Sequence, residues 1–359
     1  MPAIDAPVDI DPALPDPPVG SFASDNSAGV SPEVMSALAA ANEGPALAYG
    51  DDPWTDAAVE AFRELFDAPV EVYLCWGGTG ANVVGLATLL QPWQAVVCTD
   101  SAHIVVDECG APARFTGATI VAVPHVDGKL RPEAVAGFLD WQGTEHHPQP
   151  AVVSISQVSE MGTVYSVDEI AALCDLAHAH EMLVHLDGAR IANAVAATAT
   201  DLGALVRDPG VDVLTFGLTK NGAMYGEAVV FLRPELAAQA KYVRKQAGQL
   251  TSKSRFVAAQ ITALLTDDLW LRNARHANAM AALLAERVGD IPGVDVVRDP
   301  EANSVFAHVP ADRLRALQQW SFFWEWDLSA SLVRWMTSFA TTEADIERFA
   351  GGVEKILAR

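Results

Sequence analysis

The stretch Val211–Phe231, VDVLTFGLTKNGAMYGEAVVF, holds two apolar runs on either side of a glycine-rich turn. Val211–Leu214 and Ala228–Phe231 are short, and the glycines between them interrupt any helical period, so the pattern predicts two buried strands. Lys220 lies in the turn between them. A lysine at the end of a buried strand can be desolvated, which lowers the pKa of its amine and makes it a candidate to form a Schiff base. The alternative is an ordinary solvated lysine in a loop.

Apolar strands and helical segments alternate over the rest of the chain. Short apolar runs predict strands over Val70–Cys75, Ala95–Thr99, Thr119–Val123, Val152–Ile155 and Leu183–Leu186. Helical spacing predicts helices over Pro32–Ala41, Thr55–Phe66, Val83–Leu90, Pro132–Leu139, Val167–His180 and Phe256–Val288, the last broken near Thr266. Near-continuous apolar strands that alternate with helices indicate an α/β fold, with a mostly parallel sheet covered by helices on both faces.

Composition and pattern divide the chain into three parts. Residues 1–20 are rich in proline and aspartate and show no period, which predicts a flexible N-terminal tail. Residues 21–262 carry the strand–helix alternation and form the expected large domain. Residues 263–359, with strands near Val294–Val297 and Ser304–His308, form the expected smaller C-terminal α+β domain.

Two further stretches place polar groups directly after apolar strands. His185–Ala194, HLDGARIANA, ends a strand in an aspartate, a glycine and an arginine. Trp76–Asn82, WGGTGAN, puts a glycine-rich turn between a strand and a helix. The free N–H groups and the dipole at the start of a helix attract anions, and missing side chains let a ligand approach. This turn lacks the Walker lysine and the full dinucleotide fingerprint, and such a turn alone can also serve only to pack a helix closely.

HLDGARIANA together with Thr215–Gly226, TFGLTKNGAMYG, resembles the threonine aldolase and aromatic amino acid β-eliminating lyase family of pyridoxal 5'-phosphate (PLP) enzymes. The resemblance runs from about Ser21 to the end of the chain. It implies the PLP-dependent transferase-like fold of aspartate aminotransferase, fold type I. It also implies that Asp187 keeps the pyridine nitrogen of PLP protonated, that Lys220 forms the Schiff base, and that Arg190 contacts both cofactor and substrate.

The resemblance assigns further residues to the cofactor. Gly78 and Thr79, in the glycine-rich turn, are expected to bind the PLP phosphate. His103 follows the predicted strand Ala95–Thr99, and the resemblance implies that its imidazole lies flat on the PLP ring as a candidate catalytic group. A lone histidine is otherwise most often a surface residue or a satisfied core residue.

Two residues are assigned to the substrate in the same way. Ser24, within Ser21–Asn26 (SFASDN), is expected near the substrate carboxylate, although the segment fits a helix cap or turn equally well. Arg334, within Val333–Thr337 (VRWMT), is expected to grip the α-carboxylate, because the planar guanidinium can bond both oxygens at once. The alternative is a structural surface arginine.

Two regions depart from the pattern of the family. Glu160 stands where some threonine aldolases have a second histidine, which puts a histidine base from this loop in doubt. Lys241–Arg255 is basic. It is either a solvated helix face or a segment that sends Lys253 or Arg255 to the phosphate of a neighbouring subunit.

Bulk properties restrict partners and location. The formal net charge of −23 argues against nucleic acid and anionic membranes, which both need a basic surface. The start of the chain has no signal-peptide pattern, and no apolar run reaches about 18 residues, so we expect a cytoplasmic protein. The cysteines form no CxxC pair, which predicts reduced, mostly buried thiols at Cys75, Cys98, Cys109 and Cys174. His146 and His147 lie in a polar loop and are expected to be exposed, and we expect no metal site.

The resemblance implies a lyase that cleaves the Cα–Cβ bond of L-threonine, L-allo-threonine or phenylserine-type substrates to glycine and an aldehyde. The base that takes the β-hydroxyl proton stays open among His103, a bound water and Glu160. The resemblance further implies a homo-oligomer, a dimer of dimers, in which Tyr49 borders the site across a subunit interface. The alternatives are another PLP reaction, β-elimination or aminotransfer, and a catalytically silent homologue.

Overall fold

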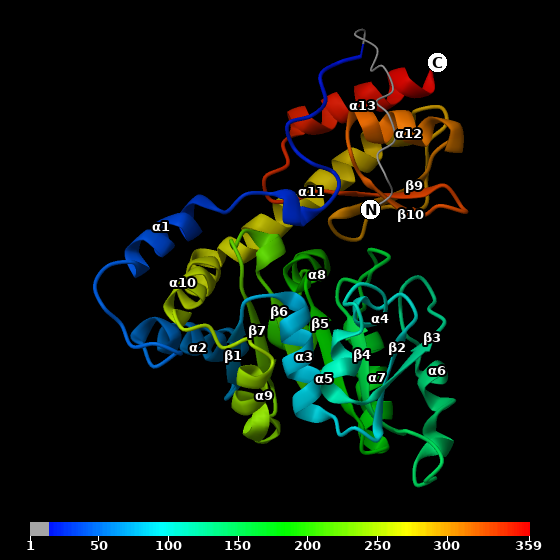
Figure 1. The fold of residues 1–359 in the computed structure, drawn as a ribbon. Coiled ribbons are helices and arrows are strands. Elements are labelled where there is room, and N and C mark those ends of the chain that lie inside the picture. The colour runs from blue at the N-terminus through cyan, green and yellow to red at the C-terminus, as the bar shows by residue number, and fades with distance from the viewer. Residues whose placement is uncertain (1–13) are drawn as a thin grey trace. The chain divides into compact units, whose positions relative to one another are not determined.

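The computed structural model describes residues 14–359, which form two compact units (Figure 1). The large unit is continuous in sequence and comprises Val30–Leu271. The small unit combines the segment that ends at Gly29 with Arg272–Arg359. The small unit is therefore built from both ends of the described chain.

The division differs from the sequence-based domain boundaries at two places. Residue 262, the predicted end of the large domain, lies inside helix α10 (Ser254–Leu265). Because α10 packs on α1 (Pro32–Ala41) and α2 (Pro53–Phe66), the whole of α10 belongs to the large unit. Residues 21–29, expected in the large domain, belong to the small unit, because Phe22 is fully buried in its core.

The large unit contains a seven-stranded sheet in the order β1-β7-β6-β5-β4-β2-β3. The strands are β1 (Glu71–Cys75), β2 (Gln94–Thr99), β3 (Thr119–Val123), β4 (Gln149–Ser156), β5 (Leu183–Gly188), β6 (Val213–Gly217) and β7 (Glu227–Phe231). Only β7 runs against its neighbours, since it returns directly from β6 with Gly217 opposite Glu227. The predicted mostly parallel sheet is confirmed.

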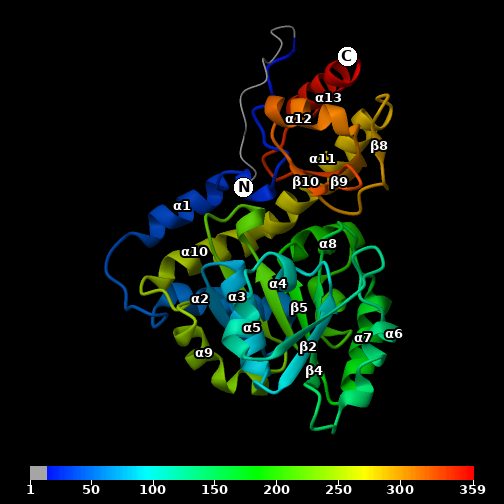
Figure 2. The same cartoon turned by 45° about the vertical axis from the view of Figure 1, so that its right-hand side comes forward.

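Helices cover both faces of this sheet. Those not yet given are α3 (Gly78–Leu89), α4 (His103–Val106), α5 (Ala111–Thr116), α6 (Pro132–Ala136), α7 (Val167–Ala179), α8 (Ile191–Thr198) and α9 (Ala240–Gln246). Figure 2 shows α3 and α5 on one side of the strands and α7 on the other. Local sequence fixes the helix starts: Asp52 accepts a hydrogen bond from Thr55 N at 2.9 Å, and Ser166 with Glu169 forms a capping box at α7.

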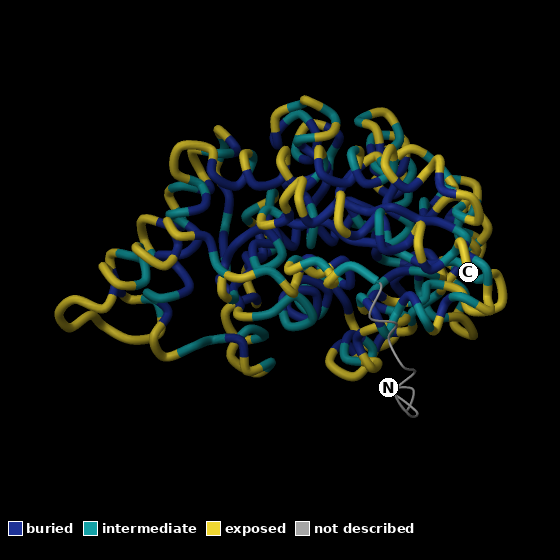
Figure 3. The backbone as a smooth tube through the Cα atoms, turned by 90° about the horizontal axis from the view of Figure 1, so that it is seen from above, coloured by how far each residue is buried: buried dark blue, intermediate teal, exposed yellow. Residues whose placement is uncertain are grey.

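The core of the large unit lies along the central strands. Every residue of β6 and β7 is buried, as the two apolar runs of Val211–Phe231 predict. In Figure 3 the buried segments run through the interior of the backbone trace and the exposed segments lie at its margins. Short one-turn elements complete the secondary structure: 3-10 turns at Asp25–Ser27, Leu139–Trp141, Thr219–Asn221 (η4), Pro234–Gln239 and Thr266–Asp268, and a π turn at Gly203–Arg207.

The small unit contains a four-stranded antiparallel sheet in the order β10-β11-β9-β8. Its strands are β8 (Asp295–Val296), β9 (Ser304–His308), β10 (Trp324–Asp327) and β11 (Leu332–Met336), and its helices are α12 (Ala311–Trp320) and α13 (Glu343–Leu357). Most of α11 (Leu269–Gly289) also belongs to it. Aromatic rings dominate the core, with Phe349 in contact with Phe22, Trp320, Phe323 and Trp335.

The segment before residue 21 is anchored to the small unit over the part that the structure describes. Leu14 packs on the aromatic core, Pro15 O accepts a hydrogen bond from Trp320 Nε1 at 2.8 Å, and Gly20 N donates to Asp345 Oδ1 at 2.9 Å. Residues 14–20 thus make both polar and apolar contacts with the small unit, and the flexible tail over residues 1–20 stays a prediction. Residues 1–13 lie outside the described residues.

Removing residues 1–20 is expected to destabilise the small unit. The deletion leaves the buried Trp320 indole and the Asp345 carboxylate each short of a partner and uncovers core surface, which together cost about 2–4 kcal/mol of unfolding free energy. Urea unfolding followed by tryptophan fluorescence measures the loss. A chain shortened by residues 1–13 alone retains these contacts and serves as the control; equal stability of both truncations would contradict the expectation.

Candidate active site

Polar groups gather at the carboxyl ends of parallel strands in the large unit. Asp187 lies near the end of β5, Lys220 lies in η4 directly after β6, and the glycine-rich turn from Gly77 follows β1. His103 follows β2. Since β1, β2, β5 and β6 run in one direction, their ends meet at the same edge, where such sheets bind ligands.

Glu227 fixes the turn that presents Lys220. Its carboxylate accepts hydrogen bonds from Leu218 N and from Thr219 Oγ1, both at 2.8 Å. Gly217 lets this turn approach β5, because a Cβ at that position would lie 2.4 Å from Ala189 O. Lys220 itself is half-buried. Glu227 and Gly217 thus hold the turn on either side of Lys220.

Burial raises the pKa of Glu227 to about 7, although the hydrogen bonds from Thr219 and Leu218 and the charge of Lys220 oppose the shift. The folded protein therefore binds more protons than the unfolded chain between pH 4.5 and about 7, and the unfolding free energy falls as pH rises through this window. Glu227 was not among the predicted site residues. The available signal was a single carboxylate in the otherwise apolar run GEAVVF.

Replacing Glu227 with glutamine is expected to remove this pH dependence, since the amide does not ionise. The wild-type protein should lose about 3 kcal/mol more unfolding free energy than the variant on going from about pH 4.5 to pH 8. Urea unfolding at both pH values measures the difference. Glu60, exposed on α2, is the matched control as Glu60→Gln. If the unfolding free energy changes equally with pH in the wild type and in Glu227→Gln, Glu227 does not titrate in this range.

Asp187 is buried and held from both sides. Its Oδ2 accepts a hydrogen bond from Asn82 Nδ2 at 2.7 Å, and its Oδ1 accepts from Ala189 N at 3.0 Å. Gly188, the next residue, lies against β6, where a Cβ would meet Thr215 O at 2.6 Å. The carboxylate is therefore fixed in orientation, as the pairing of a ligand's ring nitrogen requires.

His103 begins α4 and is anchored at two atoms. Its backbone N–H donates to Glu160 Oε1 at 3.0 Å, and its Nδ1 lies 2.8 Å from Glu108 Oε1. Its side chain is 40% exposed, whereas that of Glu108 is fully buried. The hydrogen bond to Glu108 raises the pKa of His103; burial opposes the shift and the charge of Asp187 supports it.

Glu160 lies beside His103 rather than free in a loop. Its Oε1 also accepts from Ser156 Oγ at 2.6 Å, and its Oε2 is buried without a hydrogen-bond partner among residues 14–359. Burial raises the pKa of this carboxyl group. The residue expected at the place of a second histidine is thus a carboxylate that supports the backbone of His103.

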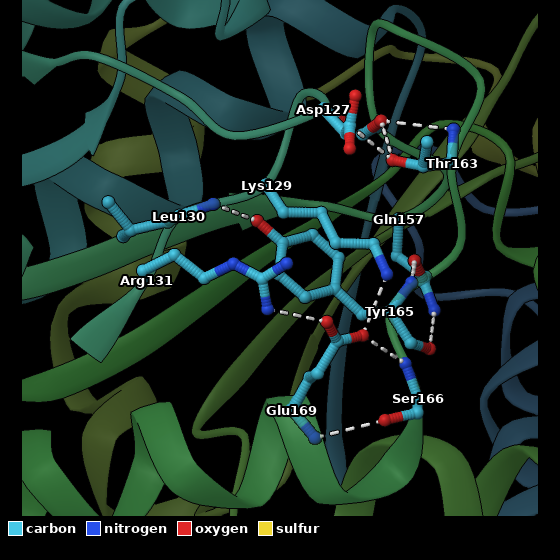
Figure 4. Close-up of polar contacts among 10 residues, drawn as sticks. Asp127, Lys129, Leu130, Arg131, Gln157, Thr163, Tyr165, Ser166 and Glu169 are labelled. Carbon is cyan, nitrogen blue, oxygen red and sulfur yellow. Dashed lines mark hydrogen bonds and ion pairs between the residues drawn. The ribbon is translucent and has the colours of Figure 1, made fainter. Parts of the chain in front are cut away.

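A hydrogen-bonded network fixes the loop that carries Glu160 (Figure 4). The side chain of Gln157 bonds both the N–H and the C=O of Tyr165, at 2.9 Å each. The Tyr165 hydroxyl accepts from Leu130 N at 2.6 Å. Glu169 closes the network through ion pairs with Lys129 at 2.7 Å and Arg131 at 2.8 Å. These contacts fix the conformation of the loop.

The glycine-rich turn forms an open cradle at the start of α3, a helix of 12 residues. Gly77 caps the helix without a side chain, and a Cβ at Gly77 or Gly78 would meet nothing within 4 Å. Gly80, in contrast, is covered by Gln249, whose Oε1 accepts from Trp76 N at 3.3 Å. The cradle is open where an anion can approach the first N–H groups of the helix.

The basic segment Lys241–Arg255 makes several contacts within the large unit. Arg244 lies 5.2 Å from the Tyr73 ring centroid, Lys245 lies 4.9 Å from that of Tyr49, and Arg255 Nη1 donates to Gly44 O at 2.8 Å. Gln249, which covers Gly80, belongs to the same segment and was not predicted. The solvated helix face and the reach of Lys253 or Arg255 to a neighbouring subunit's phosphate both stay predictions.

The predicted substrate residues lie in different units. Arg334 is on β11 of the small unit, and its guanidinium carbon lies 4.6 Å from the Trp326 ring centroid. Ser24 is also in the small unit, where its Oγ accepts from Asn26 N at 3.1 Å as a cap. Arg190 directly precedes α8 in the large unit.

The large-unit residues fit PLP. Asp187 offers a fixed carboxylate for a protonated pyridine nitrogen, Lys220 offers an amine, and the cradle at Gly78 and Thr79 offers N–H groups to a phosphate. His103 offers a partly exposed ring at the same edge of the sheet. No cluster of metal-binding side chains occurs among residues 14–359.

The remaining predictions concern surface groups and thiols. His146 and His147 are exposed, as expected. Cys75, Cys98 and Cys174 are buried and Cys109 is exposed, all as free thiols. In the part of the chain that the structure describes, no helix has the length and apolar character to cross a membrane.

Comparisons with known proteins agree with the geometry. A sequence model of the beta-eliminating lyase family matches residues 21–312. The low specificity L-threonine aldolase of Pseudomonas sp. (strain NCIMB 10558) is 40% identical over 340 residues, which cover 94% of this chain and 98% of that protein. The enzyme of the same name from Pseudomonas aeruginosa is 42% identical over 330 residues, 91% of this chain and 94% of that protein.

Solved structures support the fold. The threonine aldolase of Leishmania major superimposes with a TM-score of 0.87 at 30% identity and covers 94% of this chain and 99% of its own. The serine palmitoyltransferase of Sphingomonas wittichii has a TM-score of 0.71 at 14% identity, over 94% of this chain and 86% of its own. The predicted fold class is confirmed.

Proposed function

Since this chain belongs to the beta-eliminating lyase family, we propose that it is a PLP-dependent lyase that cleaves the Cα–Cβ bond of L-threonine and related β-hydroxy-α-amino acids to glycine and an aldehyde. The observation that carries the proposal is the set formed by Asp187, Lys220 and the Gly78–Thr79 cradle at one edge of the large sheet. The names of the Pseudomonas relatives support the reaction type.

Bound PLP supplies an electron-accepting ring next to the Cα of the amino acid. Asp187 would pair with its pyridine nitrogen, Lys220 would hold it covalently, and the N–H groups of Gly78 and Thr79 would hold its phosphate. Arg190 contributes a further positive charge from the start of α8. His103 would cover the ring, and its contacts with Glu108 and Glu160 hold the residue in place.

The substrate is held by its carboxylate and loses a proton from its β-hydroxyl. Arg334, assisted by Arg190 and Ser24, binds the carboxylate and so selects which bond of Cα is cleaved. His103 Nε2 accepts the hydroxyl proton, because its Nδ1 is engaged by Glu108. Glu160 is less suited to this step, because its Oε1 already accepts from His103 N and Ser156 Oγ.

Aldehyde release tests the function. The purified protein, loaded with PLP, is incubated with L-threonine, L-allo-threonine or phenylserine, and the aldehyde is detected with an NADH-coupled alcohol dehydrogenase. Equimolar glycine and aldehyde are expected. Formation of a keto acid instead would indicate β-elimination or aminotransfer, and the absence of any product from all three would favour the silent homologue.

We also propose that the protein is a cytoplasmic homo-oligomer, a dimer of dimers, with Tyr49 and the Lys241–Arg255 segment near a subunit interface. Leu47, Tyr49 and Tyr242 are large apolar side chains with 73%, 50% and 63% of their surface exposed, which supports a covered surface in the assembly. Light scattering coupled to size exclusion is expected to give four times the chain mass. A fully active monomer at assay concentration would contradict this.

A further inference from the structure

A row of buried hydrogen bonds connects His103 with Asp187 in the large unit. His103 Nδ1 lies 2.8 Å from Glu108 Oε1, which also accepts from Asn82 Nδ2 at 2.8 Å. The same amide nitrogen donates to Asp187 Oδ2 at 2.7 Å. We propose that Glu108 and Asn82 are positioning residues: Glu108 keeps a proton on Nδ1 of His103, and Asn82 joins this pair to Asp187. The inference rests on the proposed function, in which His103 covers the cofactor ring and Asp187 pairs with its pyridine nitrogen.

Burial of the Glu108 carboxylate lowers the stability of the fold, so we infer that this residue is kept for its role in the site. Its side chain is fully buried, and Oε1 receives both hydrogen bonds while Oε2 has no partner among residues 14–359. Asp345 shows the structural use of a carboxylate in this chain: both of its oxygens are bonded, one to Gly20 and the other to Thr342. A buried carboxylate oxygen without a hydrogen-bond partner destabilises the fold. Stability therefore does not explain such a residue, and a role in the site does.

The bond to Glu108 determines where the protons of His103 lie. A carboxylate only accepts, so Nδ1 carries a proton and Nε2 is left to exchange one with a ligand. The other charged groups near the imidazole are Asp187, Lys220 and Glu160; Asp187 supports the protonated form and Lys220 opposes it. Without Glu108 the ring would lose both its fixed orientation and its strongest stabilisation of the proton.

Asn82 separates two carboxylates that would otherwise face each other with no donor between them. Its partners, Glu108 and Asp187, are carboxylates that only accept, so both amide hydrogens of Asn82 are used. The Asn82 Oδ1 atom is buried without a hydrogen-bond partner in the described chain. Asn82 is four residues after Gly78 in α3, which puts it on the same face of the helix as the phosphate cradle. One helix thus orients the phosphate turn and the Asp187 carboxylate together.

The pKa of His103 in the full-length, cofactor-free chain tests the assignment independently of turnover. The ring carbons of labelled histidine are followed by NMR against pH, and His103→Asn identifies the signal. Glu108→Gln is expected to lower the His103 pKa, because the hydrogen bond to the Glu108 carboxylate is the largest cause that raises it. Asn82→Ala is expected to raise it, because Glu108 then loses its competing donor. Glu60→Gln is the control and should leave it unchanged.

Shifts of the His103 pKa in opposite directions in Glu108→Gln and Asn82→Ala support the inference, because general damage to the fold would shift this pKa in the same direction in both variants. An unchanged His103 pKa in either variant, or equal shifts in both, would overturn it. If Glu108→Gln does not fold, the Asn82→Ala titration decides alone. Asn82→Ala should also raise the PLP dissociation constant about tenfold, because Asp187 loses a hydrogen bond. The aldehyde assay on the wild type tests the proposed function separately, so the two failures are distinguishable.

Discussion

Lys220→Ala is expected to bind PLP without covalent attachment and to lose turnover of L-threonine by at least about 1,000-fold. The fold of the site should survive, because Glu227 holds the turn through Leu218 N and Thr219 Oγ1, which the substitution leaves in place. Cofactor retention is measured by dialysis and visible absorbance, and turnover by aldehyde release. Lys355→Ala, at an exposed position on α13, is the matched control.

Borohydride reduction of the PLP-loaded wild type identifies the attached lysine directly. Peptide mapping is expected to place the phosphopyridoxyl group on Lys220 and on no other lysine. A label on Lys241 or Lys253 would overturn the assignment. The same outcome would remove the role proposed for Glu227 in presenting the reactive amine.

Arg334→Ala is expected to lower kcat/KM for L-threonine by about 10- to 1,000-fold, which corresponds to a bidentate charge-assisted contact of about 2–4 kcal/mol. Cofactor absorbance should stay nearly unchanged, because the cofactor is assigned to Asp187, Lys220 and the Gly78–Thr79 cradle. Arg334→Lys should recover little, since an ammonium lacks the planar fork and stacks less well on Trp326.

The kinetic pattern separates two uses of Arg334. A rise in KM indicates weakened binding of the carboxylate, whereas a loss confined to kcat indicates that the Cα–Cβ bond is misoriented. Wild-type kinetics in Arg334→Ala would show that the carboxylate is held elsewhere, with Arg190 as the next candidate. The small unit would then lose its assigned part in substrate binding.

Strand positions were predictable because buried parallel strands read as continuous apolar runs. β3 and β9 match their predicted ranges, and α1 begins and ends where its period and Pro32 indicate. The break in the long helical segment at Thr266 was also predicted, and Asp267 there has a left-handed φ of 51°. These features depend on local sequence alone.

The supporting residues of the site were not predictable in the same way. Asn82 and Asp187 are 105 residues apart, and Trp76 and Gln249 are 173 apart, so each looks like an isolated polar residue until the fold brings its partner close. Glu108 directly follows Asp107 and looks like one half of an ordinary acidic pair, and Glu227 is a single acid in an apolar run. The motif residues assigned by family resemblance stay proposals, whereas their hydrogen-bonded supports came only from the structure.

The composition of the small unit from both ends of the chain has a consequence for synthesis on the ribosome. The large unit is complete once Leu271 has emerged, so it can fold while translation continues. Phe22 and the segment around it are made first but have no core to enter until β11 and α13 follow, near the end of the chain. The earliest residues that the structure describes are thus among the last to reach their native contacts, and until then the nascent chain exposes an aromatic side chain that chaperones can bind.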